Sequence, residues 1–140
     1  MSVKVTSISA EVGQVLPGFS VTLTRADLVR YAGASTDFNA IHWSDSKAAE
    51  VGLPGVIAHG MLTMGLALRL VTDWVGDPGR VHSYGVRFVR PIVVDETHGA
   101  TVEFSGKVTK VSGLVATVSL EALYEGAKVL GSATAEVDIA

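Results

Sequence analysis

Cysteine is absent from the 140 residues of this chain, and charged residues are scarce. Without cysteine there are no disulfides, thiolate nucleophiles or cysteine-containing zinc sites, and a reducing compartment is allowed. Charged residues make up 18% of the sequence, below the roughly 25% that is usual in globular domains, which leaves apolar surface for a partner to cover. We therefore expect an oligomer.

Basic runs are also missing. The net charge is −3, and no cluster of lysine and arginine occurs anywhere in the sequence. The chain thus lacks the electrostatic footprint of a nucleic-acid-binding protein, and we expect no nucleic-acid partner.

No hydrophobic run is long enough for a membrane span. The most apolar stretch, GMLTMGLALRLVTDWVG (residues 60–76), contains Arg69 and Asp73 and is shorter than the ~20 residues that a bilayer requires. The first 18 residues carry polar and charged side chains throughout, unlike the apolar segment of a signal peptide. We therefore expect no membrane contact and a cytoplasmic location.

Hydrophobic residues, by contrast, are 48% of a chain whose length suits one domain with its own core. Local signals predict where its first helices begin and end. Thr24, with Asp27 three residues later, approximates a capping box, and the helix that follows should end near Ser35. Ser44 and Gly52 are typical of the start and stop of a short second helix.

A long apolar helix is predicted from Gly60 or Met61 to the sequence GDPG (residues 76–79). Its sides are apolar almost all round, so it should be surrounded by other structure. After Gly79 the hydrophobic period changes to two, which predicts four successive strands in addition to a short one over residues 19–23. The pattern predicts an α+β fold in which a curved antiparallel sheet, ending in a meander, wraps around one long central helix.

The segment DFNAIHW (residues 37–43) places a carboxylate, a carboxamide and an imidazole within six positions. With ordinary pKa values of about 3.9 and 6.5, Asp37 and His42 are suited to share the two proton transfers of an elimination or an addition of water. Asn39 can orient the carboxylate or a substrate oxygen. The same residue types also form polar turns after helix ends, so both interpretations stay open on spacing alone.

A second candidate element is AHGM (residues 58–61) at the start of the long helix. There the N–H of Gly60 lacks a helical acceptor and can hold a carbonyl oxygen whose negative charge grows during a reaction. An ordinary helix start gives the same pattern. His59 is predicted to be buried and hydrogen-bonded to backbone, without a part in proton transfer.

Other kinds of site are not indicated. His82 and His98 have no partner at metal-ligand spacing, so no metal site is predicted. The sequence has no Gly-rich phosphate loop, nucleophile elbow or dinucleotide fingerprint, which argues against nucleotide, NAD and serine-hydrolase chemistry.

The run YAGASTDFNAIHWSDSKAAEVGLPGVIAHGMLTMG (residues 31–65) resembles the hydratase 2 motif of the MaoC-like family of (R)-specific enoyl-CoA hydratases and (3R)-hydroxyacyl thioester dehydratases. Within that family, the segments LTRADLVRYAG, IHWSD, IAHGMLTMG, WVGDPG and VRF are most similar to the beta subunits of mycobacterial (3R)-hydroxyacyl-ACP dehydratases. The resemblance covers residues 23–88.

This resemblance implies a single hot-dog domain over residues 1–140 that reversibly hydrates trans-2-enoyl thioesters and dehydrates (3R)-hydroxyacyl thioesters. By position, Asp37 and His42 are the catalytic pair, Asn39 orients the substrate, and the N–H of Gly60 is the oxyanion donor. No metal or redox cofactor is implied, because coenzyme A or an acyl-carrier pantetheine is part of the substrate.

The implied partners are the acyl thioester, an acyl carrier protein as one of the two carriers, and a second copy or a homologous hot-dog subunit. Two alternatives remain, a noncatalytic subunit that binds thioesters or stabilises a partner, and a hot-dog thioesterase. Thr36 stands where the motif usually has glycine, and Ala40 where it usually has proline. Neither change removes a reacting group, so we expect altered loop stiffness or substrate fit.

Overall fold

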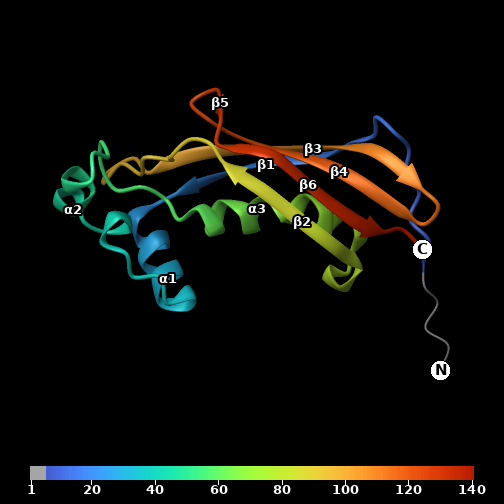
Figure 1. Ribbon diagram of the computed structural model, residues 1–140, viewed down its shortest axis with the longest axis horizontal. Helices are drawn as coiled ribbons and strands as arrows, with labels where there is room; N and C mark the ends of the chain where they lie inside the picture. The colour runs from blue at the N-terminus through green and yellow to red at the C-terminus, as the bar shows by residue number, and fades with distance from the viewer. Residues whose placement is uncertain (1–5) are drawn as a thin grey trace.

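One long helix, α3 (Gly60–Val75), packs against a six-stranded antiparallel sheet in the computed structural model, which describes residues 6–140 (Figure 1). The strands are β1 (Val15–Leu23), β2 (Val81–Phe88), β3 (Ala100–Ser112), β4 (Val115–Tyr124), β5 (Ala127–Lys128) and β6 (Leu130–Asp138). The shorter helices are α1 (Arg25–Ser35) and α2 (Asp45–Glu50), with two 3₁₀ turns, η1 (Ala40–His42) and η2 (Pro78–Arg80). Both α1 and α2 lie near the N-terminal end of α3 (Figure 1).

The strand order differs from the predicted meander. The sheet runs β1-β3-β4-β6-β2, with β5 paired to β4. Thus β2 pairs with β6 at one edge, while β3 pairs with β1 at the other. A hydrophobic period of two identifies strands and their faces but carries no information about neighbours. The connection over residues 89–99 carries the chain from β2 at one edge to β3, the strand next to β1 at the other edge.

The sheet covers one side of α3, and its buried side chains form the core with those of the strands. Thr63, Ala67, Leu70, Val71 and Val75 are the buried residues of the helix. Because a valine or leucine side chain contributes roughly 1.5–3 kcal/mol when fully buried, Leu70, Val71 and Val75 anchor the helix to the sheet.

The opposite side of α3 is exposed, so the prediction that other structure surrounds the helix on all sides is wrong. Met61, Gly65, Arg69 and Asp73 recur every four residues and are exposed. Spacing of four places them on one face of the helix, so the few polar residues in this stretch mark its open side. Among residues 6–140, no helix combines the length and the apolar character needed to span a bilayer.

The predicted helix boundaries are confirmed by their caps. The Thr24 side chain and the Asp27 side chain form a reciprocal capping box at the start of α1, and Ser44 caps α2. The α1 helix ends at Thr36, whose backbone is left-handed with φ 63° and ψ 13°. This conformation is rare for a β-branched residue and explains why glycine suits the position.

Thr36→Gly is expected to raise the free energy of unfolding by about 1 kcal/mol, because glycine adopts the left-handed conformation without the steric cost of a side chain. Thr36→Ala is the matched control, since alanine keeps a Cβ and most of that cost. Urea denaturation of the wild type and both variants measures the difference. A glycine variant no more stable than the alanine variant would contradict the interpretation.

Candidate active site

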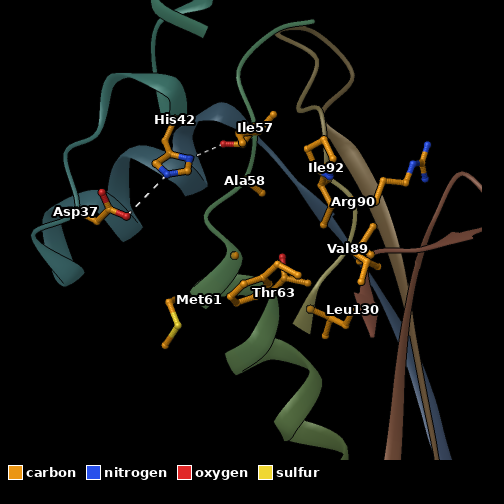
Figure 2. Close-up of a pocket in the computed structure, with 14 residues that line it drawn as sticks. Asp37, His42, Ile57, Ala58, Met61, Thr63, Val89, Arg90, Ile92 and Leu130 are labelled. Carbon is orange, nitrogen blue, oxygen red and sulfur yellow. Dashed lines mark hydrogen bonds and ion pairs between the residues drawn. The ribbon is translucent and has the colours of Figure 1, made fainter. Parts of the chain in front are cut away.

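A short turn after α1 brings Asp37 and His42 face to face. The carboxylate Oδ2 of Asp37 lies 3.8 Å from Nε2 of His42 (Figure 2). The His42 side chain is 8% exposed and that of Asp37 51% exposed, so the imidazole belongs to the protein interior and the carboxylate reaches solvent. At 3.8 Å the two groups form no direct hydrogen bond, which leaves room for each to bind the same small polar molecule.

Asn39 holds this turn in place. Its side-chain Oδ1 accepts a hydrogen bond from the N–H of Ile41 at 3.2 Å and so caps η1, and its own N–H donates to Asp37 Oδ1 at 3.2 Å. Asn39 does not line the pocket that Asp37 and His42 enter. Ala40 is the first residue of η1, a position that accepts proline because its N–H has no helical acceptor.

The orientation of His42 is set by a backbone carbonyl. Its Nδ1 lies 2.7 Å from the oxygen of Ile57, and because a carbonyl only accepts, Nδ1 carries the proton. In the neutral ring Nε2 is then unprotonated and faces Asp37, ready to accept a proton. Ile57 is itself fixed, since its N–H donates to the oxygen of Ile41 at 3.1 Å and it forms a β-bridge with Val93.

A salt bridge next to the site joins three segments of chain. Arg25, in α1, donates two hydrogen bonds of 3.0 and 2.9 Å to Asp45 in α2, and a third of 2.7 Å to the oxygen of Val94. Asp45 also accepts from the N–H of Val56 at 3.0 Å. The hydrogen bonds from Arg25 and Val56 lower the pKa of the Asp45 carboxyl group. Asp45 therefore stays ionised near neutral pH and fixes the chain one residue before Ile57.

The first residue of α3 lines the site. Gly60 is the first residue of the helix, and no hydrogen bond within residues 6–140 uses its N–H. The ring of Phe88 lies directly against this glycine: a Cβ at position 60 would be 2.9 Å from Phe88 Cε1. An added Cβ would force the Phe88 ring to shift, so close approach rather than backbone conformation favours glycine here.

Asp37, His42 and Gly60 open into one pocket of about 460 Å³. This volume is within the usual range for small-molecule sites. The pocket is mostly apolar away from the pair, as Figure 2 shows. Its other lining residues are Ile57, Ala58, Met61, Thr63, Phe88, Val89, Arg90, Pro91, Ile92, Val129 and Leu130.

Several of these lining residues are not identified by the sequence. The Ile57 carbonyl is a backbone group and carries no side-chain signal. Thr63 lies three residues after Gly60, a helical spacing that places both on one face and could have identified it. Val89 and Leu130 belong to segments that only the β2–β6 pairing brings to α3, and that pairing is absent from the predicted meander.

The prediction that His59 is buried and hydrogen-bonded to backbone is confirmed, and its exclusion from proton transfer stays a prediction. It is 1% exposed, and its Nε2 lies 3.2 Å from the backbone oxygen of Asp37. Asp37, His42 and His59 each present one potential metal-ligand atom, all within 4.8 Å of one another. Nε2 of His59 already donates to a carbonyl, which disfavours a metal at that nitrogen, and the absence of a metal site stays a prediction.

Known proteins share the sequence pattern of this chain. A family model described as "MaoC like domain" matches residues 8–124. The chain belongs to the MaoC-like family. It is 33% identical over 109 residues to the 3-oxo-4,17-pregnadiene-20-carboxyl-CoA hydratase beta subunit of Mycobacterium tuberculosis, covering 78% of this chain and 81% of that one.

Two solved structures support the same assignment. A MaoC-like dehydratase has a TM-score of 0.92 and 41% identity, over 96% of this chain and 43% of that chain. The (R)-hydratase from A. caviae involved in PHA biosynthesis has a TM-score of 0.83 and 26% identity, over 94% of this chain and 98% of that one. The predicted MaoC-like family and hot-dog fold are confirmed, and this MaoC-like chain spans less than half of the first of these two structures.

Proposed function

We propose that this MaoC-like chain reversibly adds water to trans-2-enoyl thioesters, giving (3R)-hydroxyacyl thioesters. The observation that carries the proposal is the convergence of Asp37, Nε2 of His42 and the N–H of Gly60 on one pocket. Relatives named as hydratase and dehydratase support the reaction class, and the (R)-hydratase supports the stereochemistry.

In the hydration direction, the oxygen of water forms a bond to C3 of the enoyl group, one proton of water leaves, and a proton is delivered to C2. Asp37 and His42 make these two transfers between them. The Asp37 carboxylate and Nε2 of His42 lie 3.8 Å apart on the same side of the pocket. Both groups therefore reach the same face of the double bond, which favours syn addition. The N–H of Gly60 stabilises the negative charge that develops on the thioester oxygen.

The remaining parts of the site have supporting roles. Asn39 orients the substrate indirectly, by holding Asp37 and the turn that carries His42. The apolar wall formed by Met61, Val89 and Leu130 receives the acyl chain. No metal or redox cofactor is required, because the thioester carbonyl acidifies C2 and the pantetheine arm arrives with the substrate.

Asp37→Asn and His42→Ala are each expected to lower kcat/KM for crotonyl-CoA hydration by at least ~100-fold, the usual contribution of a general acid or base. Loss of enoyl absorbance measures the reaction. Asp138→Asn and His82→Ala are matched controls, because these two residues form a carboxylate–imidazole pair with a 2.8 Å contact outside the pocket. The controls should keep wild-type activity.

Free thiol release and thioester binding, measured alongside enoyl absorbance, separate the alternatives. A wild-type protein that releases free thiol without hydrating the enoyl group is a thioesterase, and one that binds the thioester but consumes none of it is a noncatalytic subunit. Either result, obtained with the assembled complex, would refute the proposed reaction. Full hydratase activity in Asp37→Asn or His42→Ala would refute the assignment of the pair.

Gly60→Pro tests the oxyanion role, because proline removes the N–H while suiting the first position of a helix. His59 has φ −61° and ψ 128°, a conformation that a following proline favours. Gly60→Ala is the matched control, since both variants add the same Cβ against Phe88. Removing one oxyanion donor should lower kcat roughly 10²–10³-fold in the proline variant relative to the alanine variant. Equal activities would contradict the role.

We also propose that the chain works as a dimer, with a second copy or a homologous hot-dog subunit. Large apolar side chains are exposed in the catalytic turn and at the pocket: Phe38, Trp43, Met61, Phe88 and Val89. Such a cluster is typical of a surface that a partner covers, and one relative is named a beta subunit.

The active complex should have at least twice the 14.6 kDa mass of the chain by native mass spectrometry. Full activity at the mass of one chain would exclude the dimer requirement.

A further inference from the structure

His59 is a buried histidine whose role is not accounted for by helix capping or by the pocket. It is the N-cap residue of α3, yet its side chain makes no capping hydrogen bond. It is 1% exposed and does not line the pocket. A buried imidazole that neither caps the helix nor meets the substrate requires another role.

His59 contacts both His42 and the backbone of Asp37. The ring of His59 stacks on that of His42, with centroids 3.7 Å apart and planes 20° apart. Its Nε2 lies 3.2 Å from the backbone oxygen of Asp37. Tyr31 closes the remaining side, with an edge contact at 4.8 Å between ring centroids. One side chain therefore contacts the plane of the imidazole and the backbone that carries the carboxylate.

The charge state of His59 follows from these contacts. The carbonyl of Asp37 only accepts, so Nε2 carries the proton and Nδ1 is bare. Nδ1 is buried and has no hydrogen-bond partner within residues 6–140. Burial has the largest effect and lowers the pKa of His59; the hydrogen bond to the Asp37 carbonyl raises it by less, and the charge of the stacked His42 lowers it again. With its pKa lowered, His59 is a neutral imidazole near neutral pH.

We propose that His59 is a positioning residue for hydration: its Nε2–H holds the Asp37 backbone while its ring fixes the plane of His42. This inference rests on the proposed function. Asp37 and His42 belong to a short turn that is otherwise held by Asn39, η1 and the Ile57 carbonyl. Proton transfer depends on sub-ångström alignment, so a rigid buried support behind both groups raises the rate of the chemical step.

The unpartnered Nδ1 distinguishes this role from simple core packing. A buried acceptor without a donor costs stability, and a phenylalanine of similar shape would remove that cost while still filling the space. The Asp37 residue is exposed, so water can replace the lost donor at its carbonyl. For packing alone, phenylalanine would serve better than histidine at position 59.

Three variants separate the two contacts. His59→Phe keeps a stacking ring but no donor, His59→Gln keeps an amide donor near the Nε2 position but no ring, and His59→Ala keeps neither. We expect kcat to fall about 10- to 100-fold in His59→Ala, the scale of a ~1 Å misalignment, with KM changed much less. Phenylalanine and glutamine should each restore part of the rate, and His59→Phe should melt no lower than the wild type.

An NMR measurement tests the positioning without any turnover. The Nδ1–H proton of His42, hydrogen-bonded to Ile57, should give a protected imidazole resonance in the wild type that exchanges faster in His59→Ala. His82→Phe, which removes an imidazole outside the pocket, should leave this exchange unchanged. If the wild type proves to lack hydratase activity, this result still decides whether His59 orders His42.

Two outcomes would overturn the proposal. One is a His59→Ala variant with wild-type kcat and an unchanged His42 resonance. The other is an equal loss of activity in all three variants in proportion to a loss of thermal stability, which would identify His59 as a packing residue only.

Discussion

The hydrogen bond between Nδ1 of His42 and the carbonyl of Ile57, 2.7 Å long, is the constraint on which the rest of the site depends. It determines which nitrogen of the ring is free and where that nitrogen points. A carbonyl can do this only if the chain that carries it is immobile. The N–H bond to Ile41, the bridge to Val93 and the salt bridge that holds Val56 all serve that end.

The hot-dog architecture gives this constraint its setting. The sheet anchors α3 through one buried face, which fixes the N-terminus of the helix in space. The turn after α1 and the segment before α3 then meet over that N-terminus, so that side-chain groups and a backbone N–H approach one pocket from separate parts of the chain. The fold supplies rigidity, and the residues of the proposed reaction lie together at one end of the helix.

The sequence predicts the parts of this arrangement that have local causes. Helix boundaries at Thr24 and Ser44 follow from capping chemistry between residues close in sequence, and the spacing of Asp37 and His42 already suggests a pair. The strand order could not be predicted, because pairing β2 with β6 depends on contacts between residues about 50 positions apart. The Ile57 carbonyl could not be predicted either, since every residue has one and only the tertiary fold selects which one faces an imidazole.

Gly60 and Phe88 show how such distant contacts restrict which sequences can form this site. With 2.9 Å between a Cβ at position 60 and the ring of Phe88, the two positions share one volume, although 28 positions separate them in the chain. A larger residue at position 60 is compatible with this pocket only when position 88 carries a smaller or displaced side chain. The residue at position 88, at the end of an edge strand, therefore limits the size of the side chain that can stand at the first position of the helix.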